Sequence, residues 1–280
     1  AGSGSWGSAN GTGTAASFNS PQGITTDGTN LYLVDRSNHK IRKIVIATGA
    51  VTTLAGSGQA GSTDATGTSA KFNYPFGITT DGTNIYVGDS DNHKIRKIVI
   101  STGAVTTLAG GAGSYGSTDA TGTSARFKYP RGITTDGTNL YVADKDNHKI
   151  RKIVISTGAV TTLAGSSSGS TNGTGTSARF RYPQGIITDG TNLYVADTDN
   201  HLIRKIVISS GVVTTLAGSS QGFLDHTTGT SAKFDFPNGI TTDGTNLYVV
   251  DKNNQKIRKI VISSGVVTTL AGSSQGFLDH

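Results

Sequence analysis

The chain has 280 residues, with 39 Gly, no Cys, no Met and a formal net charge of +6. The lack of cysteine excludes disulfides and thiolate chemistry, and no apolar stretch is long enough to span a membrane, so we expect no membrane partner. All 18 acidic residues are Asp, which favours turns over helices, so the composition predicts short strands joined by Gly-rich turns.

The chain contains five copies of one sequence unit. An aromatic residue opens each copy at spacings of 54, 55, 53 and 54 residues, and a proline follows three positions later each time. The opening residues are Phe18, Phe72, Phe127, Phe180 and Phe234. Such a period indicates units that bury their faces against one another.

Within the third unit, four short strands follow one another. Residues 132–135 (GITT) lead to the turn DGTN, and residues 140–144 (LYVAD) lead to the turn DKDNH. Residues 149–155 (KIRKIVI) end at the turn STGA, and residues 160–165 (VTTLAG) form the fourth strand. Four antiparallel strands at this period are typical of a β-propeller blade.

We therefore predict an all-β fold, a β-propeller of five four-stranded antiparallel blades, or else part of a six-bladed or larger array. One domain covers residues 1–280, and Gly/Ser/Thr-rich connectors join its blades. The predicted blades span about 18–56, 72–110, 127–165, 180–218 and 234–272. Because the chain lacks Met, we expect an excised or processed piece, or an engineered protein. We expect a monomer if the five-blade ring closes, and an oligomer otherwise.

The repeated pattern P-x-G-I…D…LYVAD-x-x-N-x-I-R-K-I…VTTLAG resembles the NHL-repeat β-propellers, over essentially the whole chain. This resemblance implies scaffolding of protein partners, and RNA binding on a positive face in some relatives. It extends to propeller lyases and lactonases, whose asymmetric metal-ligand sets have no match here. We therefore expect no enzyme, no catalytic residue, no metal and no cofactor.

The turns divide between two faces because successive strands alternate in direction. The DGTN and STGA turns share one face, and the DKDNH turns share the other face, the top face, with the connectors. A calcium loop would need more oxygen ligands, and one His per blade would not converge on zinc. We interpret the Asp and Asn of the DKDNH turn as structural hydrogen-bonding residues. They are Asp35 with Asn38, Asp89 with Asn92, Asp144 with Asn147, Asp197 with Asn200, and Asp251 with Asn254.

The third strand of each blade carries a basic run such as Lys149, Arg151 and Lys152. We interpret it as a solvated outer belt, paired in part with Asp, rather than a groove for nucleic acid. The pI of about 9.4 arises largely from this run and supports nucleic-acid binding only weakly.

Positions that vary between the copies are the candidate recognition sites on the top face. Aromatic and polar residues on the connectors and beside the prolines form a tentative ligand-binding set: Trp6, Phe76, Tyr115, Arg131, Gln184, Phe223 and Asn238. A basic patch is expected from Arg126, Lys128, Arg131, Arg179 and Arg181.

The pattern predicts a non-enzymatic scaffold or multivalent binding module that recognises a ligand or partner on the top face. Lectin-like carbohydrate binding is one alternative, because aromatic and Gly-rich loops suit sugar stacking. RNA binding through the basic patch is another alternative. The uniform copies also fit an engineered or reconstructed repeat protein with no native ligand.

Overall fold

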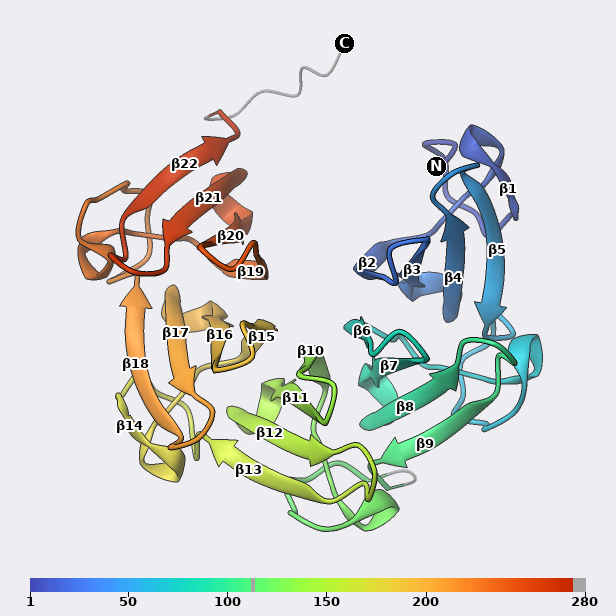
Figure 1. The fold of residues 1–280 in the computed structure, drawn as a ribbon, viewed down its shortest axis with the longest axis horizontal. Coiled ribbons are helices and arrows are strands. Elements are labelled where there is room, and N and C mark those ends of the chain that lie inside the picture. Colours follow the sequence, from blue (N-terminus) through green and yellow to red (C-terminus); the bar gives the residue numbers. More distant parts are fainter. Residues whose placement is uncertain (112–113, 274–280) are drawn as a thin grey trace. The chain divides into compact units, whose positions relative to one another are not determined.

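The computed structural model describes residues 1–111 and 114–273. Its fold is a five-bladed β-propeller of four-stranded antiparallel sheets, as the repeats predicted (Figure 1). In each blade the strands lie side by side in chain order. The first blade consists of β2 (Pro21–Thr26), β3 (Asn30–Asp35), β4 (Lys40–Val45) and β5 (Ala50–Ala55).

The other four blades repeat this order. The second contains β6 (Ile78–Thr80), β7 (Asn84–Asp89), β8 (Lys94–Val99) and β9 (Val105–Ala109). The third contains β10 (Pro130–Thr135), β11 (Asn139–Asp144), β12 (Lys149–Val154) and β13 (Val160–Ala164). The fourth contains β15 (Pro183–Thr188), β16 (Asn192–Asp197), β17 (Leu202–Val207) and β18 (Val212–Ala217). The fifth contains β19 (Pro237–Thr242), β20 (Asn246–Asp251), β21 (Lys256–Val261) and β22 (Val267–Ala271).

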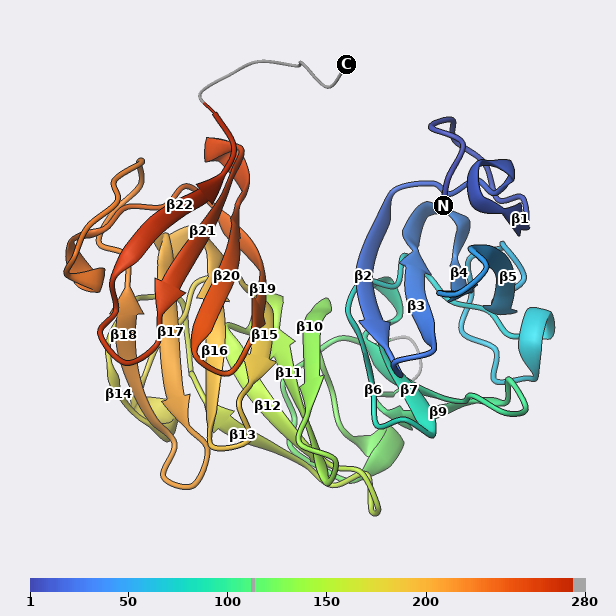
Figure 2. The same cartoon turned by 45° about the horizontal axis from the view of Figure 1, so that its top comes forward.

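The connector that precedes a blade lies along the fourth strand of that blade, which the sequence pattern did not predict. The short strand β1 (Gly11–Thr12) pairs with β5, and β14 (Gly173–Thr174) pairs with β18. A single bridge between Thr66 and Ala104 marks the same contact in the second blade. The view in Figure 2 shows β1 beside β5. Each connector therefore belongs structurally to the blade that follows it.

The chain divides into two compact units, Ala1–Val142 with Lys152–Thr161, and Ala143–Arg151 with Thr162–His280. In the first unit, Tyr32 and Ile41 of the first blade pack against Phe72, Ile85 and Val87 of the second. The second unit repeats this arrangement between its two complete blades, the fourth and the fifth. Burial of these apolar faces between blades provides the hydrophobic core of each unit.

No described segment forms a helix long and apolar enough to cross a membrane.

Candidate functional site

The second strand of each blade ends at an aspartate, and a single turn of 3₁₀ helix follows it. In the first blade this turn is η2 (Arg36–Asn38), and His39 closes it with a φ of 53°. This left-handed conformation is uncommon for residues other than glycine, and histidine is among the side chains that tolerate it. The same conformation recurs at His93, His148, His201 and Gln255.

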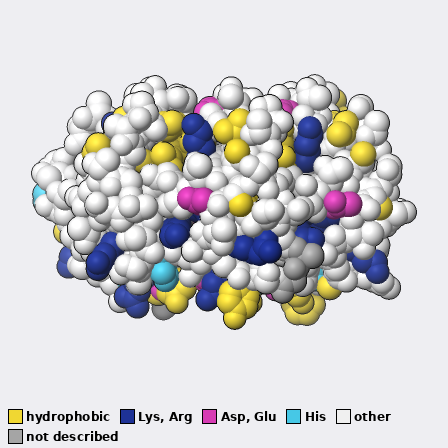
Figure 3. Space-filling view, turned by 90° about the horizontal axis from the view of Figure 1, so that it is seen from below, with side chains coloured by type: hydrophobic (Ala, Val, Ile, Leu, Met, Phe, Trp, Pro, Cys, Tyr) yellow, Lys and Arg dark blue, Asp and Glu magenta, His cyan; other side chains and the backbone are white. Residues whose placement is uncertain are grey.

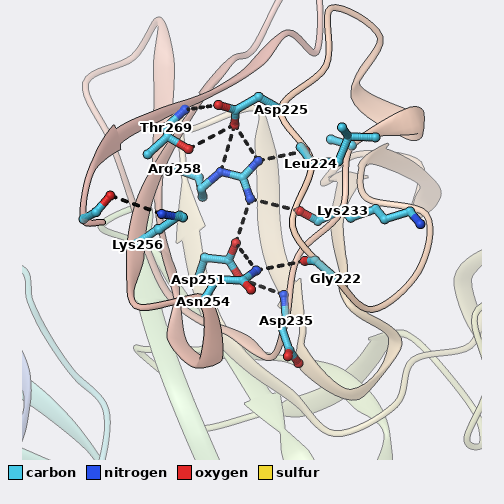
Figure 4. Close-up of polar contacts among 12 residues, drawn as sticks. Gly222, Leu224, Asp225, Lys233, Asp235, Asp251, Asn254, Lys256, Arg258 and Thr269 are labelled. Carbon is cyan, nitrogen blue, oxygen red and sulfur yellow. Dashed lines mark hydrogen bonds and ion pairs between the residues drawn. The ribbon is translucent and has the colours of Figure 1, made fainter. Parts of the chain in front are cut away.

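A buried ion pair lies beside each of these turns. In the fifth blade the Arg258 Nη1 donates to Asp251 Oδ2 over 2.7 Å, and Asn254 Nδ2 donates to the same oxygen over 2.9 Å (Figure 4). The side chains of Arg258 and Asp251 are both fully buried. The guanidinium also lies over the Phe234 ring, 4.9 Å from its centroid. We call the Asp, Asn and Arg of one blade its arginine cluster.

The arginine cluster fastens the connector to the blade. The Nη1 of Arg258 also donates to the Lys233 carbonyl, and Nη2 donates to the Leu224 carbonyl and to Asp225 Oδ1. Asp225 in turn accepts a hydrogen bond from the backbone N–H of Thr269 on β22. Figure 4 shows these connector groups converging on one guanidinium.

The same buried pair occurs in every blade with an N–O distance of 2.7 or 2.8 Å. The other four pairs are Asp35–Arg42, Asp89–Arg96, Asp144–Arg151 and Asp197–Arg204. The expectation of a solvated basic belt is therefore wrong for these arginines, all of which are fully buried. The pairing with Asp was expected, but their burial was not. The connector packs over the third strand and buries these arginines. The alternation of residues along the strand does not predict this packing.

Burial raises the pKa of two of the carboxylates in these clusters. Complete burial raises the pKa of Asp89 to about 6, although the Arg96 guanidinium and hydrogen bonds from Asn73 and Asn92 oppose this shift. Burial likewise raises the pKa of Asp197 to about 6. Both groups are therefore mainly charged at neutral pH and hold their arginines as ion pairs.

The opposite end of each blade carries a second aspartate, in the DGTN turn. In the first blade Asp27 Oδ1 accepts from the backbone N–H groups of Thr29 and Asn30, and Asp27 Oδ2 accepts from the Tyr32 hydroxyl over 2.7 Å. Slight burial opposes its charge, but hydrogen bonds from Asn30, Tyr32 and Thr29 outweigh this and hold its pKa well below the usual range. This arrangement explains why the DGTN turn recurs unchanged.

A histidine joins each of four turns to the aromatic residue before proline in the next unit. The Tyr74 backbone N–H donates to His39 Nδ1 over 3.1 Å, and the two rings meet edge to face with centroids 4.6 Å apart. Tyr74 itself has a φ of 43°, so its backbone is strained. The corresponding pairs are His93–Tyr129, His148–Tyr182 and His201–Phe236. We call these four the junction pairs.

The aromatic rings of the junction pairs are partly exposed, and two of them lie beside cations. Tyr74 is 37% exposed and has the Arg36 guanidinium 4.8 Å from its ring centroid. Lys145 lies similarly over Tyr182. At the second pair a further ring, Tyr115, lies 5.7 Å from His93 and is 64% exposed. From the sequence, the histidines were considered only as zinc ligands, and their contact with the next unit was not predicted.

The tentative ligand-binding residues are divided between the two units. Trp6 and Phe223 are exposed on connectors, and the Phe223 ring has Lys256 Nζ 4.7 Å from its centroid. The residues after proline contact one another between neighbouring blades. The Arg131 guanidinium lies 4.1 Å from the Phe76 ring centroid, and Asn238 Nδ2 donates to Gln184 Oε1 over 3.4 Å. Their role in recognition stays a prediction.

The basic patch is divided between the two units. Arg126, Lys128 and Arg131 belong to the first unit, and Arg179 and Arg181 to the second. Arg126 binds the carbonyls of Thr123 and Ala125. Lys and Arg side chains are interspersed with hydrophobic ones on the face drawn in Figure 3. Within residues 1–111 and 114–273, no three His, Asp, Glu or Cys side chains gather to hold a metal.

Comparison with known proteins agrees with the repeat pattern. No family model matches the chain. It is 28% identical over 294 residues to the human NHL repeat-containing protein 2, across 91% of this chain and 40% of that protein. The chain is a β-propeller similar in sequence to NHL repeat-containing proteins. It is also 30% identical over 272 residues to the Arabidopsis thaliana chloroplastic protein SUPPRESSOR OF QUENCHING 1, across 89% of this chain and 26% of that protein. The chain thus spans well under half the length of these relatives.

Solved structures share the fold of this chain. An auxiliary nutrient binding protein from Bacteroides thetaiotaomicron matches with a TM-score of 0.59 at 17% identity, covering 95% of this chain and 73% of that one. A virginiamycin B lyase from Staphylococcus aureus matches with a TM-score of 0.56 at 18% identity, covering 89% and 69%. A protein named for nutrient binding and a lyase therefore share this architecture.

Proposed function

We propose that the chain is a non-enzymatic, multivalent binding module whose individual sites are the junction pairs on the top face. The observation that carries this proposal is the repeated, partly exposed aromatic ring held in a strained left-handed backbone beside a histidine. Strain of this kind persists where the surroundings hold it in place, and it is common at ligand sites. The four pairs supply several similar sites on one chain.

The polar groups that resemble catalytic residues already have structural partners. Each buried aspartate holds its arginine, and in the junction pairs His39 Nδ1 accepts the backbone N–H of Tyr74. Catalysis needs an asymmetric set of converging groups. Near-identical copies instead favour repeated weak sites, whose combined affinity exceeds that of each one when a ligand reaches several of them.

Carbohydrate is the ligand class that these sites fit best. A partly exposed tyrosine ring such as Tyr74 offers a stacking surface, and the neighbouring side chains of Arg36 and Lys145 offer hydrogen-bond donors. Polymeric sugars also repeat along their length, which suits several similar sites. Amphipathic aromatic rings of this type contribute much of the energy at recognition surfaces.

The first blade provides the matched substitution for the test. Ser20 occupies the position of the junction aromatics with a φ of 52°, so serine is compatible with this backbone. We expect the wild-type chain to bind oligosaccharides on a glycan array, and the combined variant Tyr74→Ser, Tyr129→Ser, Tyr182→Ser and Phe236→Ser to lose most of that binding. Thr83→Ala with Thr138→Ala, in exposed DGTN turns, is the control that should bind normally.

Salt dependence separates this proposal from the RNA alternative. Stacking on aromatic rings should persist at high salt, whereas binding through phosphates falls steeply as salt rises. Retained glycan binding in the serine variant would contradict the proposal. Binding of a single-stranded RNA that salt abolishes, and that neutralising Arg126, Lys128 and Arg131 weakens, would support RNA instead.

A further inference from the structure

One position on the connectors varies between the copies although the backbone contact beside it does not. The glycine after this position donates its N–H to the carbonyl of the phenylalanine that opens the unit, over 3.0 to 3.2 Å in all five copies. The residue at the position is exposed in every copy. The residues at this connector position are Trp6, Ala60, Tyr115, Ser168 and Gln221. Neither the backbone nor packing in a core therefore explains why their types differ.

The connector position lies beside the junction pair that its blade forms with the preceding blade. On the connector of the third blade, the Tyr115 ring lies edge to face with the His93 ring, with centroids 5.7 Å apart. On the connector of the fifth blade, Gln221 Nε2 donates to Asp235 Oδ1 over 3.2 Å, and the same oxygen lies 3.8 Å from His201 Nδ1. Two different residue types at this position thus reach a junction histidine or its immediate neighbour.

At the second junction the connector position supplies a second aromatic ring. His93 has the Tyr129 ring centroid at 4.6 Å and the Tyr115 ring centroid at 5.7 Å. Tyr115 is 64% exposed, and Lys128 Nζ lies 5.2 Å from the centre of its ring. A ring this exposed buries little area in a core but presents a face to a ligand.

The first junction is a matched comparison within the same compact unit. Its pair is His39–Tyr74, and its connector position holds Ala60, which has no ring. Ala60 and Tyr115 both precede a glycine whose N–H donates to the opening phenylalanine over 3.1 Å. At this position the two junctions therefore have the same backbone contact and differ by one exposed ring.

We propose that the connector position determines the specificity of each junction site, and that Tyr115 makes the second junction the tightest site for a pyranose ring. This inference rests on the proposed carbohydrate function. Tyr115 and Tyr129 adjoin the same imidazole, so one pyranose ring contacts both of them. Ser168 and Gln221 place a hydroxyl and an amide at the third and fourth junctions, which suits hydrogen bonds to sugar hydroxyls. The four sites are therefore alike in frame but unequal in affinity.

Exchange of residues between the first two junctions tests the inference. The measurement is the apparent Kd from a protein concentration series on an array of neutral gluco-, xylo-, manno- and galacto-oligosaccharides. Tyr115→Ala should bind about tenfold more weakly than the wild type, the effect of one stacked ring. Ala60→Tyr should bind more tightly, because it adds the ring to the first junction. Tyr115→Phe, which keeps the ring, and Thr138→Ala, in an exposed turn of the third blade, are the controls that should bind normally.

The outcomes separate this inference from the function on which it rests. If the wild type binds and serine at all four junction aromatics abolishes binding, but Tyr115→Ala binds as the wild type does, only the inference is overturned. A loss in Tyr115→Phe as large as that in Tyr115→Ala would also overturn it, because the hydroxyl and not the ring would then be responsible. A wild type that binds no sugar on the array would overturn both. Circular dichroism melting should be the same for every variant, since the connector position is exposed in each copy.

Discussion

The two ends of each blade use the same short motif in opposite electrostatic settings. In the second blade Asp81 begins the DGTN turn and Asn84 ends it, and Asp89 precedes the 3₁₀ turn that Asn92 ends, with the same spacing. Hydrogen bonds lower the pKa of Asp81 even though partial burial opposes its charge, whereas complete burial raises the pKa of Asp89 to about 6. The direction of the pKa shift of such an aspartate is therefore decided by its surroundings and not by the motif.

The difference has a physical cause. At the DGTN end, hydrogen bonds and nearby water stabilise the carboxylate without a cation. At the other end the connector excludes water, so the charge is tolerated only because an arginine pairs with it. A buried ion pair contributes little net stability over an apolar substitute, but removing one partner is costly.

Removal of an arginine is therefore expected to have the largest effect. Arg204→Met leaves Asp197 buried without its cation and frees the carbonyls of Arg179 and Thr171. We expect a loss of about 3–5 kcal/mol in the free energy of unfolding, measured by denaturant titration. The neighbouring Lys205→Met, on a half-buried side chain, is the control and should cost far less.

The double variant Arg204→Met with Asp197→Asn sharpens the same comparison. It removes both charges, so part of the lost stability should return. If the double variant is no more stable than Arg204→Met alone, the cost lies in the connector carbonyls and not in the unpaired carboxylate.

The DGTN end should be less sensitive. Tyr86→Phe removes the hydroxyl that donates to Asp81 Oδ2 over 2.8 Å and leaves the ring packed in the core. We expect a loss of about 1 kcal/mol, typical of one hydrogen bond. The same denaturant titration measures it. A loss as large as that of Arg204→Met would contradict the distinction between the two ends.

Alkaline titration tests the hydrogen bond from the tyrosine side. Burial and the bond to Asp27 raise the pKa of Tyr32 from its ordinary value of 10.0 to about 12. Because the pKa is raised, the stability that the Tyr32–Asp27 hydrogen bond contributes is complete below pH 10 and is lost as the pH rises through about 12. The difference in tyrosinate absorbance between the wild type and Tyr32→Phe should show that late midpoint. A midpoint near 10 would contradict it.

The junction histidine should give the smallest effect and the opposite pH dependence. Burial lowers the pKa of His39 below its ordinary 6.5, with Asp91 opposing and Arg36 assisting. Its stabilising bond is therefore complete above pH 6.5 and is lost as the pH falls through the lowered value. His39→Gln places at this position the residue that the fifth blade has at Gln255. In this variant, the small fall of the melting temperature at acid pH should disappear. An unchanged pH profile in this variant would show that the Tyr74 N–H bond contributes nothing.

The local sequence determined the blades, their strands and their turns. Spacings of Phe and Pro, alternation in LYVAD and the DGTN turn depend on contacts within a few tens of residues, and each copy repeats them. The resemblance to NHL repeats rested on the same residues. The prediction holds for all five copies because each one repeats the same local pattern.

Only the tertiary structure decided which polar residues are buried and what they contact. The burial of Arg42 depends on a connector about thirty residues earlier in the chain, whose Ala9 carbonyl and Asn10 side chain meet its guanidinium. The partner of His39 lies in the following blade. Strand periodicity reports the side of a strand on which a residue lies, but burial is set by the distant segment that packs against that side.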